Sequence, residues 1–345
     1  MGLVEKIRHR VHTFYRQRIV REQYPMLTSL SRKEWKKKDA WGTVYMLHHI
    51  SDKDPNGIPT NEDLKVSPAF LEHIIEKYKK AGFMFLTLDE LSSIIKSGNK
   101  PDKPFVIFTI DDGYIDNYTE ALPIFEKYQV PFALFIATDF INQRSILWWD
   151  IIEDLVLQNN TIYFCEKPFS CNSFQEKWDT YRILREAILK YDQNNLFSLL
   201  QEAFSHYTID WYAPIKKQAM SWTQVKELSK HPLCTIGGHT VSHPALNKLS
   251  NSEFHHEIAE GVAILKDKTS HDIYHFAYPY GSANEIGNRE QLLIKEFNFK
   301  TVFSSYGGCI TSDNKSQTNH LPRVTLHECQ WHKNAILHKI KNKFK

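Results

Sequence analysis

The stretch 105-FVIFTIDDG-113 joins an apolar run to two adjacent carboxylates and a glycine. Its first part, 105–110, is rich in β-branched and aromatic side chains, which is typical of a buried strand. Two neighbouring aspartates repel each other, and the end of a buried strand is a costly place for them. A bound cation reverses this local electrostatics and makes clustered anions favourable. The stretch therefore predicts a buried strand whose carboxyl end binds a cation.

Short apolar runs alternate with amphipathic helical patterns on both sides of this stretch. We expect strands at 43–50, 105–110, 131–138, 233–240, 273–279, 300–305 and 321–326, and helices at 68–82, 88–98, 117–129, 222–232 and 252–268. Such alternation indicates a parallel sheet covered by helices, either open or closed into a barrel. Residues 142–220 break the rhythm with aromatic side chains and long helical patterns such as 180–204, so we expect a mainly helical insertion there.

Composition favours a soluble globular protein. Of the 345 residues, 42% are hydrophobic and 24% are charged, and the net charge is +3, so we expect no nucleic-acid partner. The five cysteines are odd in number and lack C-x-x-C spacing, which favours free thiols in a reducing compartment. No apolar stretch is typical of a secretory signal or a membrane span. We therefore expect a cytoplasmic protein.

Both ends of the chain are basic. Residues 1–41 carry apolar side chains at approximate helical spacing with Arg and His between them, and residues 331–345 form a basic tail. A basic amphipathic segment of this kind is typical of a helix on an anionic membrane surface. A terminal helix packed on its own domain has the same pattern. Peripheral contact with the inner membrane face therefore stays open.

A second stretch, 237-GGHTVSHPAL-246, supplies metal ligands. His239 and His243 are four residues apart, so on one helical turn both imidazoles point the same way. The pair follows an apolar strand, as Asp111 and Asp112 do, and the carboxyl ends of parallel strands meet at one edge. Two imidazoles and a carboxylate suit zinc, with cobalt and nickel as alternatives. The alternative without a metal is a pair of surface histidines and a helix-capping aspartate.

These motifs resemble those of one family. The chain is similar to polysaccharide deacetylases of the NodB-homology group, carbohydrate esterase family 4, through 109-TIDDG-113, 239-HTVSHP-244 and 276-FAYPYG-281, with 45-YMLHHI-50 similar to a branch that includes biofilm-polysaccharide deacetylases. The resemblance implies an α/β fold, a distorted (β/α) barrel of the NodB-homology type with a mainly helical insertion. The catalytic domain would comprise 42–141 and 221–330, and the insertion 142–220.

The resemblance also implies roles for individual residues. Asp112, His239 and His243 would hold the metal, and Asp111 would be the general base that deprotonates metal-bound water. The backbone N–H of Tyr280 would join the oxyanion hole, with Tyr278 and Pro279 beside the substrate. The implied reaction removes an acetyl group, N-acetyl first and O-acetyl as the alternative. The implied substrate is a sugar of a glycan or of a lipid-linked glycan precursor.

The chain departs from the family pattern in its later motifs. Ala277 stands where the family usually has an arginine that orients the base, and no fourth motif is evident near 300–308. His327 is one candidate for the general acid and His48 another. Arg323 is either a replacement for the missing arginine or part of the last strand. Trp148 and Trp149 form either a sugar-stacking platform or a piece of the core.

Three functions remain after this comparison. The first is a metal-dependent carbohydrate deacetylase. The second is a glycan-binding protein with a degenerate site on the same fold, which the missing motifs favour. The third is a metal-dependent hydrolase of another bond. The intact set Asp111, Asp112, His239 and His243 favours the deacetylase, because loss of activity usually erodes metal ligands as well.

Overall fold

The structure is a computed structural model that describes residues 40–328. Most of the basic amphipathic segment 1–41, the basic tail 331–345 and Cys329 lie outside the described residues. In the described part of the chain, no helix combines the length and apolar character needed to cross a bilayer.

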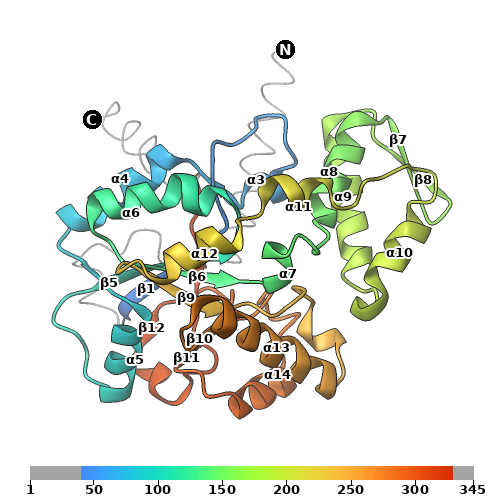
Figure 1. The fold of residues 1–345 in the computed structure, drawn as a ribbon. Coiled ribbons are helices and arrows are strands. Elements are labelled where there is room, and N and C mark those ends of the chain that lie inside the picture. The colour runs from blue at the N-terminus through green and yellow to red at the C-terminus, as the bar shows by residue number, and fades with distance from the viewer. Residues whose placement is uncertain (1–39, 329–345) are drawn as a thin grey trace, which may run out of the picture.

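A curled sheet of nine strands forms the centre of the molecule (Figure 1). Its strands are β1 (Ala40–Leu47), β4 (Met84–Phe85), β5 (Phe105–Asp112), β6 (Phe132–Ile136), β9 (Cys234–Gly238), β10 (His275–Ala277), β11 (Thr301–Phe303), β12 (Ile310–Thr311) and β13 (Val324–Thr325). The order is β11-β10-β9-β6-β5-β1-β12, with β4 beside β5 and β13 beside β1. All pairs are parallel except β1 with β12.

The segment 321–325 draws the two ends of the sheet together. Leu321 bridges Phe303 beside β11, and Val324 pairs with Tyr45 of β1. The Leu321 N–H donates to the Val302 carbonyl at 2.8 Å, so the contact to β11 is a true ladder bond. The sheet is therefore a distorted barrel, as expected from the sequence.

Helices pack around the sheet (Figure 1). They are α3 (Pro59–Glu62), α4 (Pro68–Lys80), α5 (Leu88–Ser97), α6 (Leu122–Tyr128), α7 (Thr138–Ile141), α12 (Trp222–Ser229), α13 (Asn251–Thr269) and α14 (Asn288–Leu293). Shorter turns are the π-helical η1 (Asn117–Ala121) and the 3-10 turns η3 (Leu246–Lys248), η4 (Ile294–Glu296) and η5 (Ser312–Ser316); β2 (His49–Ile50) pairs with β3 (Lys65–Val66).

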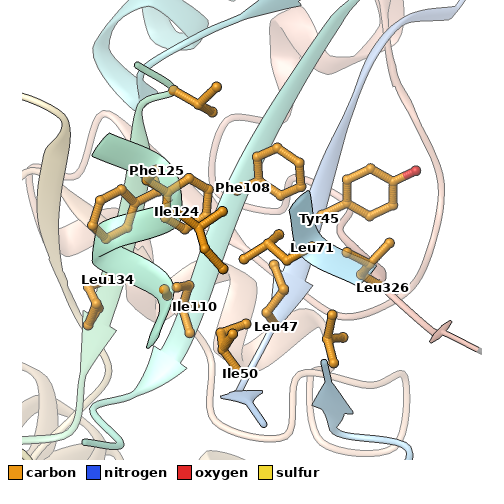
Figure 2. Packing of buried hydrophobic residues seen from close by; sticks show 14 of the residues in the cluster. Tyr45, Leu47, Ile50, Leu71, Phe108, Ile110, Ile124, Phe125, Leu134 and Leu326 are labelled. Carbon is orange, nitrogen blue, oxygen red and sulfur yellow. The ribbon is translucent and has the colours of Figure 1, made fainter. Parts of the chain in front are cut away.

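Local sequence explains the helix boundaries. The Ser67 hydroxyl caps α4, whose first residue is Pro68, and Thr87 with Glu90 forms a capping box at α5. Figure 2 shows the core between the strands and helices α4 and α6, where Phe108 and Ile110 of β5 pack against Ile124 and Phe125 of α6. Side chains alternate along β5, so Thr109 and Asp111 face the opposite side, inside the barrel.

A separate lobe lies to the right in Figure 1, drawn in green to yellow. It contains α8 (Trp148–Gln158), α9 (Phe174–Ile188), α10 (Leu196–Ala203), α11 (Ala213–Gln218), the 3-10 turn η2 (Gln193–Asn195), and a hairpin of β7 (Thr161–Phe164) with β8 (Lys167–Ser170). The sequence patterns did not indicate this hairpin, and the helical pattern at 180–204 covers parts of two helices, separated by the turn at η2. The lobe packs around a core of its own.

Candidate active site

A cavity of about 220 Å³ opens where the carboxyl ends of the strands meet the lobe. Its lining residues are Met46, His48, Thr60, Asn61, Leu64, Asp111, Asp112, Tyr114, Trp148, Trp149, Arg185, His239, His243, Tyr278 and Tyr280. Strands β1, β5, β9 and β10, helix α3 and the lobe all contribute. The volume is below the roughly 300–1,000 Å³ of pockets for drug-sized ligands, so it fits about one sugar residue.

Three potential metal ligands converge in this cavity. The Asp112 Oδ1 lies 3.4 Å from His239 Nε2 and 3.3 Å from His243 Nε2, and this buried oxygen has no hydrogen-bond partner among the described residues. His239 donates from Nδ1 to the Ala277 carbonyl at 2.7 Å, which leaves Nε2 free as a ligand. A buried carboxylate oxygen without a partner is costly, and a cation would satisfy it.

The protonation states of these groups also suit a metal. Burial lowers the pKa of His243 to about 4, so its imidazole is neutral at neutral pH. Burial acts to raise the pKa of Asp112, but His243 and His239 outweigh it, and the net pKa is well below the usual range. Metal ligands must be deprotonated, and two neutral imidazoles with a carboxylate leave open positions for water and substrate. The residues present therefore fit a divalent cation.

The two histidines come from an irregular turn, which corrects the expectation of a helical turn. After β9 the chain turns sharply through Thr240 at φ 71° and His243 at φ 60°, both left-handed. Such backbone is unfavourable for these residue types and persists where neighbours hold it. The four-residue spacing brings the imidazoles together through this turn.

Helix α13 holds the turn in place. One carboxylate oxygen of Glu257 accepts hydrogen bonds from the N–H groups of Val241 and Ser242, both at 2.9 Å. Gly261 packs so closely that an added Cβ would lie 3.0 Å from the Thr240 backbone. The supporting roles of Glu257 and Gly261 were not predicted from the sequence. A glycine inside a helical pattern is nevertheless a signal that another segment packs closely against the helix.

Asp111 has a different partner from Asp112. Arg323 binds it with both nitrogens, Nη1 to Oδ1 at 2.6 Å and Nη2 to Oδ2 at 2.8 Å, and both residues are buried. Burial acts to raise the pKa of Asp111, but Arg323 more than reverses this, and the pKa is lowered. The guanidinium also lies over the rings of Phe135 and Phe303, at 5.4 and 5.9 Å from their centres. Arg323 thus belongs to the segment that closes the barrel, and it also binds Asp111. Ala277, which stands at the position of the family's usual arginine, has no side-chain group that could make this contact.

Tyr280 lines the cavity, and its backbone N–H is the group expected to join the oxyanion hole. Its φ is 57°, and within residues 40–328 this N–H has no hydrogen-bond acceptor. The Tyr280 carbonyl is fixed by the Ser305 hydroxyl at 2.8 Å. Tyr278 also lines the cavity, whereas Pro279 is absent from the described lining residues.

Of the two histidines at the end of β1, one faces the cavity. His48 lines it, and its buried Nδ1 has no partner in the part of the chain that the structure describes. Burial lowers the His48 pKa, against the opposing effect of Asp112. His49 turns away and its Nδ1 lies 2.7 Å from an Asp116 carboxylate oxygen. His327 is half-buried and is not among the described residues that line the cavity.

The lobe covers the site. Trp148 is buried and Trp149 is half-buried; their rings meet edge to face at 5.4 Å, and Trp149 lies 6.0 Å from the His243 ring. Sequence reasoning did not foresee two further lining residues, Arg185 of α9 and Asn61 of α3. Asn61 links α3 to the lobe because its Oδ1 accepts from the Tyr181 hydroxyl at 2.6 Å.

A second, acidic cavity of about 500 Å³ adjoins the first. The two share Asn61, Leu64, Tyr114 and Trp149, and the second cavity is also lined by Asp54, Glu62, Asp116, Asp150, Glu153 and Asp154, together with Lys65 and Lys217. Burial raises the pKa of Asp150 and of Glu153.

Comparison with known sequences identifies one family. The sequence profile described as polysaccharide deacetylase matches residues 98–164 and 180–297, together more than half of the chain. YxkH of Bacillus subtilis (strain 168), which is named as a polysaccharide deacetylase, is 30% identical over 104 residues. That match covers 30% of this chain and 34% of YxkH, so the chain spans about a third of this relative.

Solved structures show the same fold. The deacetylase PplD of Streptococcus pyogenes, in complex with acetate, matches with a TM-score of 0.56 at 18% identity over 83% of this chain and 92% of that chain. IcaB from Ammonifex degensii matches with a TM-score of 0.55 at 17% identity over 86% and 96%. Because the sequence profile covers the strand-end aspartates and the histidine turn, this chain belongs to the polysaccharide deacetylase family.

Proposed function

We propose that this chain is a metal-dependent carbohydrate deacetylase that hydrolyses an N-acetyl group on a sugar of a glycan or lipid-linked glycan precursor. The observation that carries the proposal is the division of the aspartate pair. Asp112 faces two imidazoles, while Asp111 is held by Arg323 beside them. One carboxylate is thus free to bind a metal and the other to accept a proton.

Each residue then has a chemical task. Asp112, His239 and His243 would hold a divalent metal, zinc first and cobalt or nickel as alternatives, which makes water acidic and polarises the acetyl carbonyl. Asp111 accepts a proton from the attacking water, and Arg323 keeps that carboxylate ionised and oriented. The Tyr280 N–H donates to the carbonyl oxygen as negative charge develops there.

The balance of the reaction requires an acid. A carbon–oxygen bond forms at the acetyl carbon, the carbon–nitrogen bond breaks, and the leaving nitrogen takes a proton to give a free amine and acetate. His48 lines the cavity with an unpaired ring nitrogen, so we assign the proton donation to His48 rather than to His327. Trp149, half-buried at the cavity, offers the sugar a ring face.

Acetate release tests the proposal. The full-length protein, loaded with Zn²⁺ or Co²⁺, is given N-acetylated and O-acetylated sugars and glycan fragments, beside Asp111→Asn and the exposed-site control Asp102→Asn. We expect release by wild type and Asp102→Asn, and loss in Asp111→Asn with metal content unchanged. A fully metal-loaded wild type that releases no acetate from any substrate, while binding glycan, would instead establish the glycan-binding alternative.

We infer further, from sequence alone, that the basic segment 1–38 brings the protein to anionic membranes. Each Lys or Arg near anionic lipid adds on the order of 1 kcal/mol to binding. The test is flotation with anionic and neutral liposomes of the full-length chain and a variant that lacks residues 1–38. Equal recovery of both proteins with anionic liposomes would reject the inference.

A further inference from the structure

Arg185 brings a positive charge from the lobe into the active-site cavity. It lies on α9, four residues after Tyr181 and so on the same helix face. Its half-buried side chain lines the same cavity as Asp111, Asp112 and Tyr280. Helix α9 is thus the part of the lobe that places a cation opposite the metal ligands.

Among residues 40–328, Arg185 has no anionic partner. Throughout residues 40–328, its side chain makes no hydrogen bond and no ion pair. By contrast, Arg323 binds Asp111, and Arg289 pairs with Glu290 at 2.9 Å. Even the exposed Arg182, three residues earlier in α9, lies 3.7 Å from Asp179. A half-buried guanidinium without a partner has given up part of its hydration without an ion pair in return.

Arg185 and Tyr280 line the same cavity of about 220 Å³, which has room for about one sugar residue. The N–H of Tyr280 is the group proposed to contact the acetyl oxygen. A ligand group bound by Arg185 would therefore belong to the same sugar residue as the acetyl group, or to its immediate neighbour.

The charge balance of the cavity favours an anion. Arg323 neutralises Asp111, and a divalent metal would outweigh the single charge of Asp112. Arg185 then adds a positive charge that no carboxylate among the described lining residues pairs with. Opposite charges gain more from each other in a partly enclosed cavity than in water.

We propose that the acetylated sugar recognised by this chain carries an acid group, a phosphate ester or a carboxylate, and that Arg185 binds it. This inference rests on the proposed deacetylase function and narrows its substrate class. The planar fork of a guanidinium matches both kinds of anion with two parallel hydrogen bonds. The same contact would act on substrate and transition state alike, so it would lower KM more than it changes kcat.

Matched substrates and variants test Arg185. Acetate release is measured for N-acetylglucosamine, its 1-phosphate and the corresponding N-acetylated uronic acid, using metal-loaded wild type, Arg185→Gln, Arg185→Lys and the same-helix control Arg182→Gln. We expect wild type to prefer at least one anionic substrate, and Arg185→Gln to lose about ten-fold or more in kcat/KM for it, mainly through KM. For the neutral substrate, kcat/KM of Arg185→Gln should equal that of wild type. The control Arg182→Gln should match wild type on every substrate. Arg185→Lys should retain part of the preference for the anionic substrate. The two anionic substrates distinguish phosphate from carboxylate.

Ionic strength provides a readout that a purely structural role would not change. Added salt should reduce the wild-type preference for the anionic sugar and have little effect in Arg185→Gln. Equal losses on neutral and anionic sugars in Arg185→Gln would overturn the proposal, since they indicate a packing role. Turnover of neutral and anionic sugars alike by wild type would also overturn it, while leaving the deacetylase function intact.

A binding measurement separates this proposal from the deacetylase proposal. Calorimetry with the sugar 1-phosphate and the uronic acid compares Asp111→Asn with Asp111→Asn/Arg185→Gln, both metal-loaded, so that no turnover is needed. Weaker binding of an anionic sugar to the double variant supports the role of Arg185, even if no acetate is released by wild type. Equal binding of both anions to the two proteins rejects it.

Discussion

Asp111 and Asp112 are neighbours in the chain but have different partners. Asp112 ends β5 with φ 80° and faces His239 and His243, whereas Asp111 faces the barrel interior and Arg323. The left-handed backbone at Asp112 turns its carboxylate out of the strand alternation. At the scale of single residues, this backbone turn and one guanidinium give the two aspartates different surroundings, which suit the proposed metal ligand and the proposed base.

Replacement of Arg323 should change the pH dependence of catalysis. Arg323→Met removes the largest influence that opposes burial, so the pKa of Asp111, whose ionised form is the proposed base, should rise. The acidic limb of the pH profile of kcat/KM should therefore move to higher pH by about 1–3 units, since a neighbouring arginine lowers the pKa of a carboxyl group by about that amount. The measurement is the pH profile of acetate release.

Two controls accompany this prediction. Arg323→Lys keeps the charge but not the paired contact, so its acidic limb should stay near that of wild type while kcat falls. The variant Arg182→Met, at an exposed site, should match wild type in both the position of the acidic limb and kcat. Since loss of a buried partner costs about 3–5 kcal/mol, unfolding is monitored in parallel. An unshifted limb in a folded Arg323→Met would show that Asp111 is not the titrating base.

His275 should make the protein less stable in mild acid. Burial lowers its pKa to about 4 from 6.5, and its Nδ1 lies 2.7 Å from the Thr301 hydroxyl. Between these pH values the unfolded chain binds a proton that the folded chain does not, so stability is complete above pH 6.5 and falls as the pH falls toward 4. At pH 5 the loss is about 2 kcal/mol from this group.

Urea unfolding at pH 7.5 and pH 5 measures this effect. His275→Asn keeps a polar group near Thr301 but removes the titration, so its stability should fall about 2 kcal/mol less between the two pH values than that of wild type. The exposed His256→Asn should behave as wild type. Equal pH dependence in His275→Asn and wild type would contradict the prediction.

At the scale of elements, the histidine turn depends on the helix behind it. The turn has two left-handed residues, and the Glu257 carboxylate of α13 satisfies two of its N–H groups. On the other side, the Asp139 N–H of α7 donates to the Val241 carbonyl at 2.9 Å. The turn that carries His239 and His243, the proposed metal ligands, is thus held between α7 and α13.

Glu257→Ala should weaken metal binding without removing a ligand. Loss of its hydrogen bonds frees the turn, and loss of such supporting contacts typically lowers metal affinity about 10- to 100-fold. Competition with a chelator measures the affinity, and the exposed Glu260→Ala, one turn along α13, is the matched control. An affinity equal to that of wild type in Glu257→Ala would show that the turn is rigid on its own.

At the scale of the whole molecule, the site lies where separately folded parts meet. The barrel supplies the proposed metal ligands and the proposed base, α3 supplies Asn61, and the lobe supplies Trp149 and Arg185. Arg323 comes from the segment that joins the two ends of the sheet. A ligand at this junction should therefore stabilise the fold as a whole.

Metal should raise the melting temperature of the whole protein. A metal that binds the folded state, present at 100 times its Kd, adds about 2.7 kcal/mol, which corresponds to a shift of roughly 4 °C for a chain of 345 residues. We expect this shift with Zn²⁺ in wild type and in the exposed-site control His256→Asn, and its loss in Asp112→Asn. Equal shifts in Asp112→Asn and wild type would place the stabilising ion elsewhere.

The sequence by itself determined the local features. The βα rhythm, the strand that ends in Asp111 and Asp112, and the pair His239 and His243 all follow from periodicity and short motifs, and the family match covers them. Alternation along a strand and capping at a helix end are properties of a few adjacent residues. Such patterns predict the kind of fold and the proposed metal ligands.

Tertiary structure decided the contacts between distant segments. Arg323 reaches Asp111 across 212 residues of chain, and Arg185 reaches the cavity from a lobe with its own core. Neither contact has a local pattern, because it arises when the barrel closes and the lobe packs over the strand ends. The contact of Glu257 with the histidine turn also has no local pattern. Glu257 lies at a polar position of α13, and the contact forms only when the turn packs against this helix. Packing of segments far apart in the chain, which no short motif encodes, therefore completes this site.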